Sequence, residues 1–278
     1  MIDNSINNIT EKKILITYVY WEKESSLSNL NFFIQNGLYD NPKIQYNFII
    51  KGKKLSVNFP KYKNIKIFNM PNKGIDFGGY SLSLEKINIE NFEYFIFLND
   101  TVKGPFIPRY LSKERWFEYF VSLISDEVKL VGPSKNGILI PELDLFPHIQ
   151  SMAFATDKIG LEILLINNVF NLKYISNVLE REGKWGIIKK YEVAMSQIII
   201  NNGYKIEALM QCENYYEREK LQHEDIHYEK GYFEITLNPV EIMFIKTNRI
   251  NDLLTQRYTE WNTYLTGTKI NNYELSME

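Results

Sequence analysis

The stretch FIFLNDTVKGPF, Phe95–Phe106, begins as an unbroken apolar run and ends in a Gly-Pro turn. A short apolar run of this kind is typical of a strand in a parallel sheet that helices cover on both faces. Asn99, Asp100 and Thr101 follow directly after the run. These residue types form turns readily, but the carboxyl ends of parallel strands are also where ligands bind. The stretch therefore predicts an α/β sheet with a polar site at this edge.

The rest of the chain alternates strands with helices, which favours a largely parallel sheet flanked by helices. Strands are predicted at 12–21, 44–52, 65–71, 91–100, 127–134, 147–157 and 204–210, and helices at 25–38, 80–87, 114–124 and 184–203. The strand at 147–157 runs into a helix for which Asp157 is the expected N-cap. Segment 238–249 has alternating apolar positions, and the remaining residues form a polar tail with aromatics. No linker marks a second domain.

Composition excludes several classes of protein. The 278 residues are 45% hydrophobic, which is enough for a sizeable core, and the net charge of -2 gives no electrostatic footprint for nucleic acid. Cys212 is the only cysteine, so an intramolecular disulfide is excluded and a reducing compartment fits. Neither a signal peptide nor a run of apolar residues long enough to span a membrane occurs. We therefore expect a cytoplasmic protein with at most peripheral membrane association.

The sequence NKGIDFGG, residues 72–79, places three glycines around Asp76 between a predicted strand and a predicted helix. Glycines there let the backbone approach a ligand closely, and a helix N-terminus exposes N–H groups to anions. A tight turn with Asp76 as the helix N-cap explains the same residues equally well. The pattern matches neither the dinucleotide fingerprint nor the phosphate-binding P-loop.

Glu192 lies in the long helix predicted at 184–203, at the border of its apolar stripe. Partial burial at such a border suits a general base, although a surface glutamate fits the pattern as well. The histidines His148, His223 and His227 do not form the HExxH zinc motif. A serine hydrolase is also poorly supported, because the GxSxG elbow does not occur.

Five motifs, taken together in chain order, resemble the rhamnan-synthesis-protein-F-like glycosyltransferases of bacterial polysaccharide loci and large DNA viruses. They are NKGIDFGGY, FIFLNDTVKGPFIP, PHIQSMAFATD, YEVAMSQIIINNGYKI and NPVEIMFIKTNR. The resemblance covers most of the chain, from about Lys12 to Arg249. It implies the GT-A fold, a Rossmann-like domain with a mixed, mostly parallel sheet. One domain would span 1–278, with a nucleotide-sugar-binding half at 1–135, an acceptor and catalytic half at 136–250 and a C-terminal tail at 251–278.

The resemblance also implies a donor site. In GT-A enzymes an acidic motif, usually Asp-x-Asp, ends a central strand and contacts the donor ribose and a divalent metal. Asn99 and Asp100 stand in that place here, so Asp100 is the expected ligand of Mn²⁺ or Mg²⁺. One carboxylate makes a poor site for such ions, so three alternatives stay open: the metal is weakly held, a distant ligand such as His223 completes the site, or no metal binds. Asp76 and Gly78 would approach the nucleotide or the donor sugar.

The remaining motifs imply the catalytic and acceptor groups. Glu192 resembles the carboxylate that deprotonates the acceptor hydroxyl in inverting enzymes. Lys246 and Arg249 would stabilise the leaving diphosphate, and His148 and Gln150 would contact sugar hydroxyls. The expected function is therefore transfer of a sugar, with inversion, from a nucleoside-diphosphate sugar to a glycan or lipid-linked glycan. The product would be a capsule, O-antigen or rhamnan-type polysaccharide.

Two other functions stay open. A non-catalytic carbohydrate-binding relative would use the 19 Tyr and 17 Phe residues to stack on sugars. A sugar nucleotidyltransferase is built on a similar nucleotide-binding sheet, but it normally needs a loop rich in glycine and lysine after the first strand. The sequence VYWEKESSLSN has no such loop, so this alternative ranks last.

Overall fold

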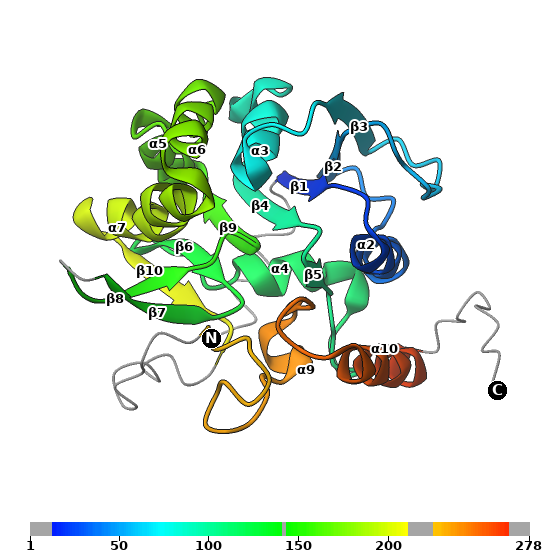
Figure 1. Ribbon diagram of the computed structural model, residues 1–278. Coiled ribbons are helices and arrows are strands. Elements are labelled where there is room, and N and C mark those ends of the chain that lie inside the picture. The colour runs from blue at the N-terminus through cyan, green and yellow to red at the C-terminus, as the bar shows by residue number, and fades with distance from the viewer. Residues whose placement is uncertain (1–12, 141–142, 211–224, 267–278) are drawn as a thin grey trace.

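The computed structural model of the protein describes residues 13–140, 143–210 and 225–266. Its centre is a seven-stranded sheet (Figure 1). All of these strands run parallel except β9, which is antiparallel to both of its neighbours. In spatial order the strands are β10 (Lys205–Ala208), β6 (Val128–Gly132), β9 (Ala153–Asp157), β4 (Tyr94–Asn99), β1 (Ile14–Tyr20), β2 (Ile44–Lys51) and β3 (Ile65–Met70).

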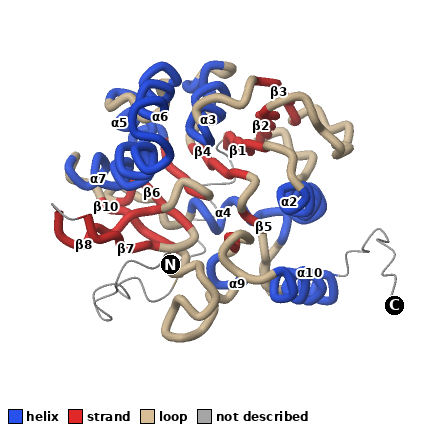
Figure 2. Tube along the Cα trace, in the orientation of Figure 1, coloured by secondary structure: helices blue, strands red, loops and turns tan. Residues whose placement is uncertain are grey.

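Helices cover both faces of this sheet (Figure 2). One face packs on α3 (Ile75–Glu85), α5 (Lys158–Ile166), α6 (Leu172–Ile187) and α7 (Ala194–Asn201), and the other on α2 (Glu24–Asn36) and α4 (Trp116–Val121). Strand β1 shows why helices pack on both faces of the sheet. Its alternate side chains Leu15 and Val19 enter the first core, whereas Ile16 and Tyr18 enter the second. Because both faces are buried, the strands read as continuous apolar runs.

Shorter elements surround the main sheet. Two small antiparallel pairs form, one from β5 (Val102–Lys103) and β11 (Ile245–Lys246), the other from β7 (Lys135–Ile140) and β8 (Leu143–Ile149). The remaining elements are the 3-10 turns at Ile89–Asn91 and Lys113–Arg115, a π-helical turn at Ile188–Val193, α9 (Pro239–Ile242) and α10 (Asp252–Thr266). None of the helices among the described residues is long and apolar enough to cross a membrane.

The predicted fold class is confirmed: one α/β domain with a mixed, mostly parallel, Rossmann-like sheet and helices on both sides. The predicted N-cap is confirmed too, since the Asp157 side chain accepts a hydrogen bond from Gly160 N at 2.9 Å. The same carboxylate also pairs with the buried Lys129 at 2.6 Å.

The glycine-rich segment is not a turn that precedes its helix. Helix α3 begins at Ile75, Gly74 is its N-cap with φ of 67°, and Asp76 is therefore not the cap. Gly78 and Gly79 lie inside the first turns of α3. A Cβ on Gly79 would approach a methyl carbon of Val19 to 2.5 Å, so this glycine lets the helix pack closely on β1.

Three further boundaries differ from the sequence prediction. The strand expected at 147–157 breaks at 150–152, so that β8 and β9 belong to different sheets. The helix expected at 184–203 contains the π-helical turn. The C-terminal tail includes α10, which docks through hydrogen bonds from Lys103 to Thr259 and from Asn262 to Asn36. These polar contacts span long sequence separations, and no local pattern predicts them.

Candidate functional site

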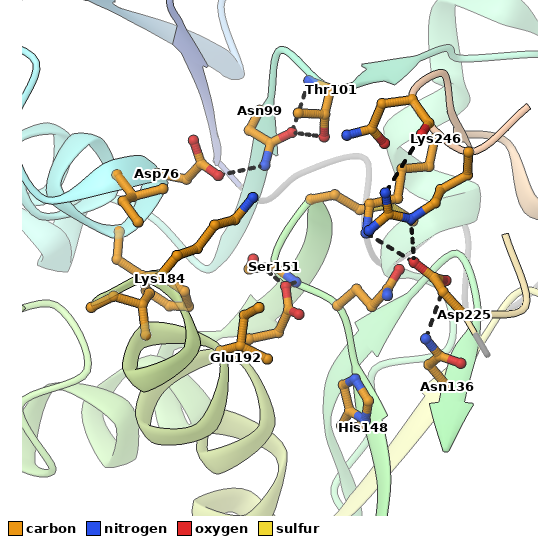
Figure 3. Close-up of a pocket in the computed structure, with 18 of the residues that line it drawn as sticks. Asp76, Asn99, Thr101, Asn136, His148, Ser151, Lys184, Glu192, Asp225 and Lys246 are labelled. Atoms are coloured by element: carbon orange, nitrogen blue, oxygen red, sulfur yellow. Dashed lines mark hydrogen bonds and ion pairs between the residues drawn. The ribbon is translucent and has the colours of Figure 1, made fainter. Parts of the chain in front are cut away.

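A cavity of about 530 Å³ opens at the carboxyl end of β4 (Figure 3). Its lining comes from the start of α3, the end of β4 and the turn between β8 and β9. The end of α6 with the π-helical turn, β7 and segment 225–249 complete it. The cavity thus joins parts of the chain that lie more than 100 residues apart in sequence. It lies at the sheet edge where a parallel α/β sheet usually binds its ligand.

Asp76 and Asn99 form the part of the lining nearest the strand end (Figure 3). Asn99 Nδ2 donates a hydrogen bond to Asp76 Oδ2 at 2.8 Å. Asn99 Oδ1 accepts from the N–H and the hydroxyl of Thr101, at 3.0 and 2.6 Å. Burial raises the pKa of Asp76, against the attraction of Lys51 and the Asn99 hydrogen bond. Asn99 is therefore engaged at both ends of its amide, and it holds the Asp76 carboxylate in the cavity.

Asp100 stands outside the described lining of this cavity. Its Oδ2 accepts a hydrogen bond from the backbone N–H of Trp21 at 2.6 Å, directly after β1. Burial raises the pKa of Asp100 to about 7, the charge of Asp76 adds to this effect, and the Trp21 N–H opposes it. The Asp100 carboxylate therefore binds the backbone at the end of β1, beside the cavity.

Replacement of this carboxylate gives a test with a defined sign. An unfolded aspartate titrates at about 3.9, so the raised folded pKa means that stability falls as the pH rises from about 4 to about 7. We expect Asp100→Asn to keep the Trp21 hydrogen bond and to remove that penalty. At pH 8 its melting temperature should exceed that of the wild type by about 2–6 °C, and near pH 4 the two should coincide. Equal melting temperatures at pH 8, with the surface variant Asp126→Asn as reference, would contradict the raised pKa of Asp100.

Glu192 lies in the π-helical turn Ile188–Val193 and lines the cavity. Its Oε2 accepts two hydrogen bonds from Ser151, from the backbone N–H at 2.8 Å and from the hydroxyl at 2.5 Å (Figure 3). Oε1 accepts no hydrogen bond from the described residues. Single π-helical turns inside α-helices occur frequently at functional sites. This carboxylate is thus held at one oxygen, and its other oxygen is available to a ligand.

Asp225 organises the opposite wall, and the sequence prediction missed it. Its Oδ2 accepts from Lys246 at 3.2 Å and from Arg249 at 3.0 Å, and its Oδ1 accepts from Asn136 at 3.2 Å. Burial alone would raise the pKa of Asp225, but His227, the two cations and the Gln150 amide together hold it below its usual range. The predicted cations Lys246 and Arg249 therefore line the cavity as an ion cluster with one carboxylate.

His227 adjoins this cluster, and its ring carries a charge only in acid, which is where its attraction lowers the pKa of Asp225. It is buried, and its Nε2 lies 2.6 Å from the Ser134 hydroxyl. Burial lowers the pKa of His227 to about 4, against the attraction of Asp225. The ring is therefore neutral at physiological pH.

The cavity lining also includes Lys184, Trp185 and Tyr228, which the sequence prediction did not single out. Trp185 is 54% exposed, and Tyr228 is 42% exposed with the Arg249 guanidinium 4.9 Å from its ring centre. Large aromatic rings of this kind combine apolar area with a polar edge, which is why they are frequent at binding surfaces. The sequence signal for Trp185 was its place in KWGIIKKYEV. It stands seven residues before Glu192, which is about two helical turns, and therefore lies on the same side of a regular helix.

The other predicted residues divide between the cavity and its support. His148 and Gln150 are buried in the lining, and Gln150 Oε1 has no hydrogen-bond partner among the described residues. Gly78 stands outside the described lining. A Cβ there would lie 2.6 Å from the Lys73 carbonyl oxygen, so Gly78 allows the α3 N-terminus to close on the preceding turn.

The predicted metal site pairs Asp100 with His223 as ligands of Mn²⁺ or Mg²⁺. Within residues 13–140, 143–210 and 225–266, no three His, Cys, Asp or Glu side chains cluster in a way that would hold a metal ion. Asp100 is engaged by Trp21, and Asn99 is engaged by Asp76 and Thr101. His223 lies outside the described residues. Because one of the two predicted ligands lies outside the described residues, the metal site stays a prediction, and we route no chemical step through such an ion.

Comparison with known proteins places the chain in a family. No curated protein matches it. Among solved structures, similarity is found to the mannosyltransferase PcManGT from Pyrobaculum calidifontis in complex with GDP-Man and Mn²⁺, at 9% identity and a TM-score of 0.42. That match covers 71% of this chain and 54% of the other, so the chain spans about half the length of that protein. The family match is to rhamnan synthesis protein F, over residues 62–266. Because this match takes in well over half of the sequence, the chain belongs to the rhamnan synthesis protein F family.

Proposed function

We propose that the protein is a glycosyltransferase that moves a sugar from a nucleoside-diphosphate sugar to a hydroxyl of a glycan or lipid-linked glycan. Membership of a family named for rhamnan synthesis supports a role in polysaccharide assembly. The observation that carries the proposal is Glu192, whose carboxylate Ser151 holds at one oxygen inside a cavity that also contains three cationic side chains. A base and a site for anions within one cavity are what sugar transfer from such a donor requires.

The reaction we propose is a direct displacement with inversion. Glu192 takes the proton of the acceptor hydroxyl, and the acceptor oxygen forms a bond to the anomeric carbon of the donor. The bond between that carbon and the diphosphate oxygen breaks, and its electron pair leaves with the nucleoside diphosphate. The enzyme contributes by orienting both substrates, by holding the base and by stabilising the charge that develops on the diphosphate.

The donor would lie along the strand end, where Asp76 accepts hydrogen bonds from sugar hydroxyls and Asn99 keeps its carboxylate in place. Asp100 and Gly78 would contribute at the edge of this site, next to the end of β1 and the start of α3. Lys246 and Arg249 are candidates to stabilise the diphosphate from the opposite wall. Because Asp225 pairs with both, they bring one net positive charge rather than two.

The acceptor would enter over the aromatic part of the lining. Trp185 and Tyr228 provide two partly exposed rings, and His148 and Gln150 provide polar groups in the same lining. The acceptor would be the growing end of a polysaccharide of the capsule, O-antigen or rhamnan type. The single cysteine of the chain suits a reducing compartment, and we propose that transfer takes place in the cytoplasm.

Incubation with a panel of UDP-, GDP- and dTDP-sugars tests this function. We expect one donor class to release its nucleoside diphosphate, faster when a suitable glycan acceptor is present, and we expect calorimetry to show binding of the matching nucleoside diphosphate. The assays should be run with Mn²⁺ and with EDTA. Binding of free glycans without binding of any nucleotide would instead identify a carbohydrate-binding protein and contradict transferase activity.

A further inference from the structure

Lys184 is a cation of the cavity lining to which no role has yet been assigned. Its side chain extends from α6 into the cavity and points toward Asp76 and Asn99 (Figure 3). Within the described part of the chain, its ammonium group makes no hydrogen bond and no ion pair. Lys246 and Arg249, by contrast, share the Asp225 carboxylate on the opposite wall. Among the described cations that line the cavity, Lys184 is therefore the one whose charge no ion pair neutralises.

The backbone before Lys184 is built to direct this side chain. Gly183 interrupts α6 with φ of 65° and ψ of -162°, a conformation that essentially only glycine adopts. A Cβ at Gly183 would meet no atom within 4 Å, so packing does not account for the glycine. The break turns the last residues of α6 away from the path of the preceding helix, and Lys184 and Trp185 both line the cavity after it.

The electrostatics of the strand end call for such a charge. Asp76 and Glu192 face the same cavity, and the nearby Glu192 carboxylate adds to the burial that raises the pKa of Asp76. A nucleoside diphosphate placed beside them adds further negative charge, which needs a cation close by. The described residues do not supply a cluster of ligands for a divalent metal. An ammonium group offers three hydrogen-bond donors and a full charge, which suits phosphate oxygens.

We propose that Lys184 binds the diphosphate of the nucleotide-sugar donor at the end of β4 and stabilises it as the leaving group. This inference rests on the proposed function and deepens it, because it assigns the contact to a residue outside the five family-like motifs. The diphosphate accepts hydrogen bonds from the Lys184 ammonium in the space bounded by Asp76 and Asn99. Lys246 and Arg249 face it from across the cavity.

Calorimetry with UDP, GDP and dTDP in EDTA tests the proposal, using whichever of the three the wild type binds most tightly. Lys184→Met should weaken the binding of that nucleoside diphosphate by about 10- to 100-fold, because the variant loses a hydrogen bond between charged groups. Lys184→Arg should retain most of the affinity, and the phosphate-free nucleoside should bind both variants like the wild type. Lys173→Met, on the same helix and outside the cavity, is the matched control and should bind like the wild type.

A second pair of variants tests the break in the helix. Gly183→Ala and Gly203→Ala both place a side chain at a positive φ with open space around it, so both should lower stability. Only Gly183→Ala should weaken the binding of the nucleoside diphosphate.

Wild-type affinity in Lys184→Met, or an equal loss for the nucleoside, overturns the assignment while the transferase function stands. If the wild type binds no nucleoside diphosphate with either EDTA or Mn²⁺, the proposed function itself fails, and this inference fails with it.

Discussion

Glu192→Gln is expected to lower the rate of sugar transfer by about 100- to 10,000-fold, the usual contribution of a positioned general base. Glutamine has nearly the same shape as glutamate and still offers an oxygen to the two Ser151 donors, so the fold should not change. It cannot take the proton of the acceptor hydroxyl. The measurement is the rate at which nucleoside diphosphate is released in the presence of acceptor, together with the Kd of the nucleoside diphosphate, which should change little.

The matched control for this variant is Glu182→Gln. Glu182 lies one element earlier, on α6, where it pairs with Lys190 at the surface and stands outside the cavity lining. Its replacement should leave the transfer rate at the wild-type value. Wild-type transfer in Glu192→Gln would show that another group accepts the proton, and it would remove the main support for the base assignment.

Asp225→Asn is expected to cost about 2–4 kcal/mol of unfolding free energy, because it leaves two cations beside a neutral side chain in a buried cluster. The side chains of Asp225 and Lys246 are each only 12% exposed, so solvent screens the loss poorly. The introduced amide oxygen would still accept from Asn136, which keeps part of the local geometry. Urea denaturation measures the change. Since the folded pKa of Asp225 is depressed, the difference should shrink as the pH falls below about 4.

The same variant should bind a nucleoside diphosphate more tightly than the wild type if Lys246 and Arg249 face the donor, because it releases both cations from their internal partner. Weaker binding would place the donor away from this wall. Glu127→Gln is the matched control, since the Glu127–Lys205 pair is shorter, at 2.6 Å, but both partners are exposed. Removing it should have little effect on stability, as is usual for surface ion pairs.

The sequence predicted a large part of the cavity. Several residues that the sequence prediction singled out line one cavity in the structure: Asp76, Glu192, His148, Gln150 and the cations of FIKTNR. The reason is that parallel strands end at one edge, and residues that follow such strands or begin the next helix meet there. The apolar run before Asn99 was therefore enough to locate the site along the fold.

The groups that the sequence prediction missed depend on contacts between distant segments. Asp225 is recognisable only beside Lys246 and Arg249, after segment 225–249 has folded over β7. Lys184 and Trp185 read as the start of a regular helix, because a glycine just before a helical pattern does not reveal a positive φ. The π-helical turn that holds Glu192 has no sequence signature either. Its register against Ser151 is set by packing.

Asp100 illustrates the same division within the stretch FIFLNDTVKGPF. Composition and apolar patterning determined that this stretch is a buried strand, that the protein is an α/β domain and that polar groups gather at the strand end. The reason is that a strand buried on both faces needs an apolar run, and this run ends where the strand reaches the edge of the sheet. Only the tertiary structure decided which way each polar side chain turns. Asn99 secures Asp76 in the cavity while Asp100 turns to the Trp21 N–H, since buried polar groups take whichever partners the neighbouring strands and helices bring within reach.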